Sequence, residues 1–330
     1  MTRRALIIGI DDYSTQPLEG CVNDAIAIAN TLEKHGNGDP NFDVRALTSN
    51  NAPINTSDIQ DALEELFASD ADTVLFYFAG HGIINPTTNV GYIVSQDGKH
   101  ASWGVSLNDI LTMANDSYPR IKSSVIVLDC CRSGALGEAP SIKEGASIIG
   151  NGVTILTACH KAGVAKETPD NHGLFTSILL DGLQGGSADI LGRVTPASLY
   201  AHVDQTLGAW EQRPIYKANV QQFIELRTVA PKVAPEILRN LPIHFPSPED
   251  HFNLDPSFEE DRTNVDPKDK LPPVNPDNVK VFKELQKCNR YGLVVPVDEE
   301  HMYYAAMHST SCKLTALGAH YRNLAELKHI

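Results

Sequence analysis

The sequence predicts an α/β fold in which a mostly parallel sheet carries helices on both faces, followed by a small helical module at the C-terminus. Two observations lead to this prediction. Up to about residue 228, short continuously apolar runs alternate with segments of helical periodicity, as expected for strands that are buried on both faces. After a proline-rich stretch, helical periodicity returns near the C-terminus. The 330 residues suffice for one large domain and a smaller one.

The strands of the predicted sheet come from short hydrophobic segments. Continuous apolar runs occupy residues 5–10, 73–78, 124–128 and 153–157, and shorter strands are expected at 44–47 and 223–226. The run at 73–78 ends before Ala79-Gly80-His81-Gly82, and that at 124–128 continues into Asp129-Cys130-Cys131-Arg132-Ser133-Gly134. In parallel sheets functional residues collect at the carboxyl ends of strands, so we expect both motifs at the functional edge.

The helices between these strands are indicated by apolar periodicity and by capping residues. The expected helices cover residues 23–35, 57–66, a segment that begins at Ser106, 174–184 and 196–209. Asn23 is the expected N-cap of the first helix, and Ser57-Asp58-Ile59-Gln60 has the spacing of a capping box. Pro196 stands at a first-turn position, where proline is well tolerated.

The chain changes character after residue 228. Ten prolines and many acidic residues lie between residues 229 and 276, and we interpret this stretch as an extended linker or as a strap over the preceding domain. Residues 277–330 regain helical periodicity, since Val279, Phe282 and Leu285 fall on one helical face. The predicted organisation is therefore a domain at 1–228, a proline-rich segment at 229–276 and a helical module at 277–330.

Composition and charge exclude several classes of function. The net charge of −14 argues against nucleic-acid binding, which requires a basic surface. The sequence has no apolar run of the roughly 20 residues that cross a membrane, and the first apolar run is too short for a secretory signal. Six cysteines without such a signal favour reduced thiols in the cytoplasm.

His81 and Cys131 are the candidate catalytic residues. His81 lies between two glycines directly after one buried strand, and Cys131 lies 50 residues later, after the next strand of the predicted sheet. Either residue alone is more often structural. A cysteine and a histidine at neighbouring strand ends instead form the pair required for nucleophilic catalysis by a thiolate.

These motifs resemble those of the caspase and metacaspase superfamily of cysteine peptidases. The resemblance rests on Tyr77-Phe78-Ala79-Gly80-His81-Gly82, on the Asp-x-Cys-x-Ser-Gly pattern from Asp129 to Gly134, and on Leu18-Glu19-Gly20-Cys21-Val22-Asn23-Asp24-Ala25. The pattern around the cysteines is closest to bacterial metacaspase-like (orthocaspase-type) proteins. The resemblance covers roughly residues 3–227 and includes Gly173-Leu174-Phe175-Thr176.

The resemblance implies a caspase-like fold and a cysteine endopeptidase that uses a Cys131–His81 dyad. Residues 1–140 would correspond to the large fragment of the family and 148–228 to the small fragment. The backbone N–H groups of Gly82 and Cys131 would form the oxyanion hole. The family motif assigns the nucleophile to Cys131, and alternation along an extended segment agrees, because it turns Cys130 toward the core.

The resemblance also implies a preference for substrates with a basic residue before the scissile bond. In metacaspases the residues that match Cys21, Asp24 and Asp129 line the first specificity pocket. Two carboxylates in a partly desolvated pocket attract a cation and repel an anion, which predicts cleavage after Arg or Lys. Asp24 has an alternative interpretation as a helix cap, because it lies near a helix start.

Processing and regulation follow from the same comparison. Lys143 lies in the region where many family members are cut into two fragments, and Lys161 and Lys166 lie in a second candidate loop. We therefore expect a self-processing zymogen, and the bacterial relatives suggest a role in antiviral defence or cell death. The module at 277–330 lies outside the resemblance and is a candidate site for a protein partner.

The sequence gives little support for a cofactor. Many metacaspases require calcium, but residues 83–108 contain Asp97 as their one carboxylate, and no Asp-x-Asp-x-Asp-Gly loop occurs. No Cys-x-x-Cys spacing suggests zinc. The alternative to a peptidase is a catalytically silent caspase-like scaffold that acts through its surface and C-terminal module.

Overall fold

The computed structural model describes residues 2–99, 102–130, 149–158, 172–208, 213–262 and 270–330. The chain divides into two compact units, Met1–Ala230 and Pro231–Ile330. Four residues singled out from the sequence lie outside the described residues, namely Cys131, Lys143, Lys161 and Lys166.

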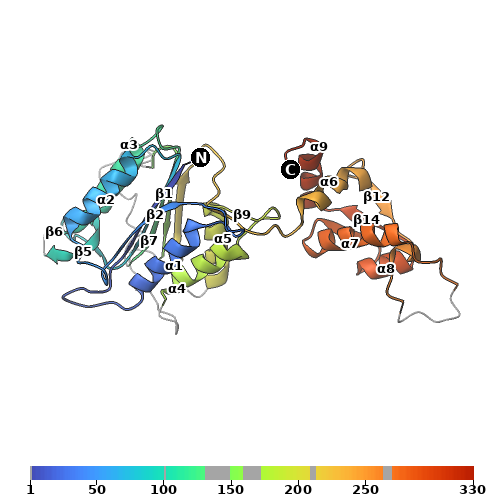
Figure 1. Ribbon diagram of the computed structural model, residues 1–330, viewed down its shortest axis with the longest axis horizontal. Helices are drawn as coiled ribbons and strands as arrows, with labels where there is room; N and C mark the ends of the chain where they lie inside the picture. The colour runs from blue at the N-terminus through green and yellow to red at the C-terminus, as the bar shows by residue number, and fades with distance from the viewer. Residues whose placement is uncertain (1, 100–101, 131–148, 159–171, 209–212, 263–269) are drawn as a thin grey trace. The chain divides into compact units, whose positions relative to one another are not determined.

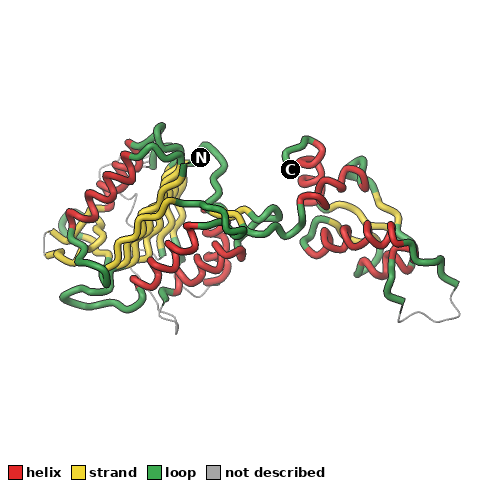
Figure 2. Tube along the Cα trace, viewed as in Figure 1, coloured by secondary structure: helices red, strands yellow, loops and turns green. Residues whose placement is uncertain are grey.

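The first unit is built on a sheet that contains six strands within the described residues, in the order β10-β8-β7-β3-β1-β2. Strands are yellow in Figure 2. These strands are β1 (Arg3–Gly9), β2 (Asp43–Thr48), β3 (Thr73–Ala79), β7 (Ser123–Asp129), β8 (Val153–Thr157) and β10 (Ile215–Asn219). All neighbours pair in parallel except β10, which runs antiparallel to β8. The prediction of a mostly parallel sheet is confirmed. The last strand lies at 215–219 and not at the expected 223–226.

Helices cover both faces of this sheet, as the sequence predicted (Figure 1). The helices of one face are α1 (Cys21–Glu33), α4 (Leu174–Asp181) and α5 (Pro196–Leu207), and those of the other are α2 (Thr56–Ala68) and α3 (Leu107–Asp116). A π-helical turn, Gly182–Gly186, follows α4, and a small ladder pairs β9 (Arg193–Val194) with β11 (Arg227–Thr228). Strands covered on both sides need apolar residues at every position, which explains the continuous runs in the sequence.

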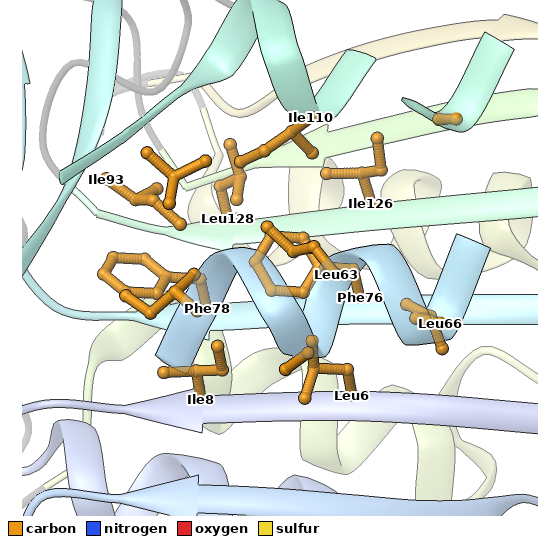
Figure 3. Packing of buried hydrophobic residues seen from close by; sticks show 14 of the residues in the cluster. Leu6, Ile8, Leu63, Leu66, Phe76, Phe78, Ile93, Ile110, Ile126 and Leu128 are labelled. Atoms are coloured by element: carbon orange, nitrogen blue, oxygen red, sulfur yellow. The ribbon is translucent and has the colours of Figure 1, made fainter. Parts of the chain in front are cut away.

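Two hydrophobic clusters hold the layers together. Leu6 and Ile8 of β1 pack with α2 and α3, whereas Ile7 packs with α1 and α4 on the opposite face. Figure 3 shows the first cluster, in which Leu63 and Leu66 of α2 lie over side chains of β1, β3 and β7. Cys130, which directly follows β7, is buried in this same cluster. Its side chain therefore packs into the core on the α2 and α3 side.

A second, smaller sheet directly follows His81. It consists of β4 (Gly82–Ile84), β5 (Gly91–Lys99) and β6 (Ser102–Ser106), all antiparallel. Burial alternates along β5, where Ile93 and Ser95 are buried and their neighbours are partly exposed. The sequence interpretation assigned no strands here, because a polar serine in a buried position weakens the alternating hydrophobic signal.

The start of α1 differs from the sequence prediction. The helix begins at Cys21, after Gly20, and Asn23 lies within its first turn instead of capping it. The carboxylate of Asp11 accepts the N–H groups of Cys21 and Val22 at 2.8 and 3.1 Å. Asp11 is ten residues away in sequence, so a search for a local capping residue could not identify it.

The second unit is a mixed α/β module that includes most of the segment interpreted as a linker. Its elements are α6 (Pro235–His244), β12 (His251–Asn253), α7 (Pro276–Arg290), β13 (Val294–Val297), α8 (Met302–Met307), β14 (Ser311–Leu314) and α9 (Ala316–Glu326), with a 3₁₀ turn at Pro256–Phe258. The strands form an antiparallel sheet in the order β12-β14-β13. The segment 229–276, interpreted as an extended linker or strap, contains α6 and β12, and the helices of the module at 277–330 are accompanied by β13 and β14. Pro235, Pro256 and Pro276 stand in first turns of helices, so these prolines mark helix starts.

Candidate active site

The candidate site lies where β3 and β7 end at the same edge of the sheet. Ala79 and Asp129, the last residues of the two strands, are direct partners in the parallel ladder. The N–H of Gly80 also donates to the carbonyl of Asp129 at 3.4 Å. His81 therefore leaves β3 beside the point where the chain leaves β7 toward residue 131.

His81 is held by residues from the loop after β1. Its backbone N–H donates to the hydroxyl of Tyr13 at 3.0 Å, and that hydroxyl donates to the carbonyl of Val94 at 3.0 Å. The rings of Tyr13 and His81 lie 4.5 Å apart between centroids. A Cβ on Gly80 would lie 2.5 Å from the Tyr13 hydroxyl, so only glycine leaves room for this contact.

The imidazole of His81 has a backbone partner that the sequence did not reveal. Nε2 of His81 lies 2.6 Å from the carbonyl oxygen of Gln16. A carbonyl only accepts hydrogen bonds, so Nε2 carries the proton and Nδ1 of the neutral ring is free to act as a base. Gln16 has a φ of 58°, a left-handed conformation that is uncommon outside glycine and that directs this carbonyl.

A cavity of about 450 Å³ adjoins His81. It lies between the loop after β1 and the small sheet, and its lining combines apolar and polar side chains. Tyr13, Ile83, Gln96 and Trp103 are among the residues that line it. The edge that carries His81 therefore offers room for an extended ligand on the side of the small sheet.

Two buried carboxylates lie on the opposite side of the sheet edge. Asp24 is in the first turn of α1 and is 2% exposed, and Asp129 at the end of β7 is 6% exposed. A Cβ placed on Gly173 would lie 2.8 Å from Oδ2 of Asp129 and 3.1 Å from Oδ2 of Asp24. Both carboxylates thus converge on the backbone of Gly173.

Each carboxylate has its own hydrogen-bond partners. Oδ1 of Asp24 accepts from Nδ1 of His172 at 2.6 Å, and Oδ2 accepts the N–H of Gly173 at 3.0 Å. Oδ2 of Asp129 accepts the hydroxyl of Thr176 at 2.6 Å. With the Thr176 proton committed to Asp129, the hydroxyl of Tyr77 at 2.6 Å is the donor to Thr176.

Cys21, the third residue that the sequence assigned to the pocket, lies near the two carboxylates. It lies one helical turn from Asp24, and Asp11, Asp129 and Asp24 surround it. Burial, and then these negative charges, raise the pKa of its thiol far above the usual range. The site therefore gathers Cys21, Asp24 and Asp129 and adds His172, Thr176 and Tyr77, which the sequence interpretation did not assign.

Burial makes both carboxyl groups weak acids. The pKa of Asp24 rises to about 6, chiefly because of desolvation, which the hydrogen bonds from His172 and Gly173 partly offset. The pKa of Asp129 rises to about 7 because of desolvation, which the hydrogen bond from Thr176 offsets only in part. Such a pair is costly to ionise and is typical of a functional site rather than of a structural one.

Asp129→Asn should therefore stabilise the protein, and more so at high pH. Below pH 7 the folded state holds a proton that the unfolded state has lost, so the free energy of unfolding falls as pH rises from about 4 to 7. Removing the carboxyl group should give a gain that grows by about 2 kcal/mol between pH 5.5 and 8.5. Urea denaturation of both proteins at the two pH values measures it. Asp43→Asn, at an exposed carboxylate, is the control, and an equal gain at both pH values would contradict the prediction.

Two features of other functional classes are not found in the described part of the chain. It contains no helix that is long and apolar enough to cross a membrane. It also contains no group of three or more His, Cys, Asp and Glu side chains arranged to hold a metal ion. Asp97 instead accepts hydrogen bonds from Ser95 and from Thr56 at the start of α2, and the hydrogen bond from Ser95 lowers its pKa.

Comparison with known proteins identifies the first unit. The family model of the caspase domain (peptidase C14) matches residues 2–224. The crystal structure of protein GSU0716 from Geobacter sulfurreducens is similar with a TM-score of 0.52 and 13% identity, over 70% of this chain and 100% of that chain. Caspase-1 from Spodoptera frugiperda gives a TM-score of 0.48 and 12% identity, over 69% and 90% of the two chains. No curated protein matches the sequence.

Proposed function

Because the chain belongs to the caspase-domain family of cysteine peptidases, we propose that it is an endopeptidase in which Cys131 is the nucleophile and His81 the proton carrier. The observation that carries this proposal is the pairing of Ala79 with Asp129, since the segment with His81 and the segment with the motif cysteine both begin at this edge of the sheet. Cys131 itself follows from the sequence motif.

The arrangement around His81 supports a thiolate mechanism. The hydrogen bond from Nε2 to Gln16 leaves Nδ1 to take the thiol proton of Cys131. The thiolate then forms a bond to the peptide carbonyl carbon, with its oxyanion held by the N–H groups of Gly82 and Cys131. As the C–N bond breaks, His81 gives the proton to the leaving amine, and it later activates the water that hydrolyses the thioester. Gln16 acts in this scheme as a positioning residue.

The two buried carboxylates support cleavage after arginine or lysine. In this proposal Cys21, Asp24 and Asp129 form the pocket for the side chain that precedes the scissile bond. The alternative role of Asp24 as a helix cap has no support, because Asp11 accepts the N–H groups at the start of α1. A cation between two desolvated carboxylates would recover the energy that their burial costs.

The proposal also covers self-cleavage, the pathway and the cellular location of the protein. We keep Lys143, Lys161 and Lys166 as candidate sites of self-cleavage in a zymogen, and a bacterial defence or cell-death pathway as its setting. Cys21, Cys288 and Cys312 carry free thiols, which supports function in the reducing cytoplasm. The second unit remains the proposed site of a protein partner, through residues 277–330.

Activity should not depend on calcium. Asp97 is the carboxylate of residues 83–108, and its oxygen is already engaged by Ser95 and Thr56. We therefore expect less than a twofold change in kcat/KM when EGTA is added in excess or when calcium is supplied at about 1 mM, a concentration that saturates weak protein sites. Initial rates on one peptide under both conditions measure this, with magnesium as control. A tenfold stimulation by calcium alone would contradict the prediction.

A fluorogenic peptide screen tests the proposed function. Substrates that differ only in Arg, Lys, Asp or Ala before the scissile bond are incubated with the full chain under reducing conditions. We expect turnover of the Arg and Lys peptides and none of the Asp peptide. Absence of turnover under every redox and calcium condition would favour the alternative, a catalytically silent scaffold.

A further inference from the structure

Asp24, one of the two carboxylates of the proposed pocket, already has a histidine as its hydrogen-bond partner. His172 precedes α4, and its Nδ1 lies 2.6 Å from Oδ1 of Asp24. The side chain of Asp24 is 3% exposed, whereas the imidazole is 27% exposed. The imidazole is therefore the solvent-facing member of the pair, and the carboxylate is the buried one.

Both oxygens of Asp24 are engaged from the same short segment. His172 binds Oδ1 and the N–H of Gly173 binds Oδ2, while Gly173 also approaches Oδ2 of Asp129. Among the described residues, no lysine or arginine forms an ion pair with either Asp24 or Asp129. Nδ1 of His172 thus donates to Asp24 where, in the proposed pocket, a substrate cation would bind.

A substrate cation would compete for that place. A guanidinium binds a carboxylate through two parallel N–H groups and an ammonium through strong charge-assisted hydrogen bonds. Either must reach Asp24, where Nδ1 of His172 already donates to Oδ1 and the N–H of Gly173 to Oδ2. A bidentate donor needs both oxygens from one direction, so it competes with the imidazole for Oδ1.

We propose that His172 is an internal occupant of the specificity pocket, which a basic substrate side chain must displace from Asp24. This inference rests on the proposed role of Asp24 and Asp129 in binding that side chain. The contact with His172 lowers the affinity of the pocket for any cation and keeps the buried carboxylate paired while no substrate is bound.

His172→Ala should tighten the binding of cations. We expect the KM for an Arg peptide to fall about fivefold to tenfold, as for loss of one competing hydrogen bond to a charged group, with kcat within a factor of about two. His172→Asn keeps a donor near the position of Nδ1 and should stay close to the native KM. His202→Ala is the matched control, because it removes a second His–Asp pair, to Asp181 at 2.7 Å, away from the proposed site.

A binding experiment separates this inference from the peptidase proposal. Benzamidine is titrated by calorimetry into full-length Cys131→Ala, with and without His172→Ala, so that no turnover is required. We expect the second protein to bind about fivefold to tenfold more tightly and Asp129→Asn to abolish binding. Should His172→Ala not fold, His172→Ser provides the same comparison.

Weaker benzamidine binding and a higher KM in His172→Ala would overturn the inference. If His172 merely orients Asp24, removing it should weaken benzamidine and raise KM, and His172→Asn should restore both. Unchanged binding would show that the imidazole does not compete. If benzamidine binds as expected but no peptide is cleaved, the proposed activity fails while the role of His172 at the carboxylate pair stands.

Discussion

Cys131→Ala should abolish peptide hydrolysis while leaving the fold intact. The sulfur of the thiolate forms the bond to the substrate, and alanine has no nucleophilic atom in its place. We therefore expect a loss of at least about 10³-fold in kcat. Fluorogenic assay of the purified full chain measures it. The same variant should remain a single intact band on prolonged incubation if processing at Lys143, Lys161 or Lys166 is self-cleavage.

Cys130→Ala is the matched control for the nucleophile. Cys130 is adjacent in sequence, but it is 2% exposed and packs in the hydrophobic cluster under α2 and α3. We expect its activity to stay within about twofold of the native chain, at a stability cost of about 1 kcal/mol for the small cavity. Loss of activity in Cys130→Ala with retention in Cys131→Ala would reverse the assignment.

His81→Ala should reduce kcat by about 10²- to 10⁴-fold, the range of a general acid–base group. The hydrogen bond from the backbone N–H of His81 to Tyr13 remains in this variant, whereas the contacts of the ring with Tyr13 and Gln16 are lost, so the melting temperature is measured beside the rate. Equal melting temperatures with unequal rates would assign the loss to chemistry. A rate close to that of the native chain would exclude His81 as the proton carrier.

The second large effect concerns the charge of the pocket. Asp24→Asn or Asp129→Asn should lower kcat/KM for an Arg peptide by about 100-fold, mainly through KM, because one partner of a desolvated ion pair is lost. Citrulline has the shape of arginine without its charge, so a citrulline peptide is the control. The ratio of Arg to citrulline turnover should fall toward one in both variants.

The pH dependence of that ratio provides an independent check. Burial raises the pKa of Asp24 to about 6 and that of Asp129 to about 7, so both lose their negative charge as pH falls through this range. The Arg-to-citrulline ratio of kcat/KM should therefore decline below about pH 7. A pH effect on the chemical step that is common to both peptides cancels in the ratio. A ratio that is constant from pH 5.5 to 8.5 would contradict the acidic pocket.

The same carboxylates explain an expected conflict between stability and function. Asp129→Asn should stabilise the chain at high pH and at the same time weaken substrate binding. Both follow from one cause. Desolvation of the carboxylate in the proposed pocket lowers the free energy of unfolding, and this loss is recovered only when a cation binds. The carboxylate pair is thus a site at which the fold is not optimised for its own stability.

Several features could be predicted from the sequence because they are local. Strands covered on both faces appear as unbroken apolar runs, and Ser106 and Pro196 mark the starts of α3 and α5 where the structure has them. The antiparallel sheet at 82–106 and the strands of the second unit were missed, because short or polar strands have no strong period of their own. Proline was misleading at 229–276, since it also begins helices.

The sequence by itself determined the fold class, the strand end that precedes His81, and Asp24 and Asp129 as candidate residues. Only the tertiary structure decided what those residues contact. The partner of the His81 ring is a backbone carbonyl 65 positions away, and the partner of Asp24 is a histidine 148 positions away. Every residue has a carbonyl, and its direction depends on φ and ψ, here 58° for φ at Gln16, so composition and spacing carry no trace of it. A buried contact between distant segments likewise exists only once the sheet has brought their ends together.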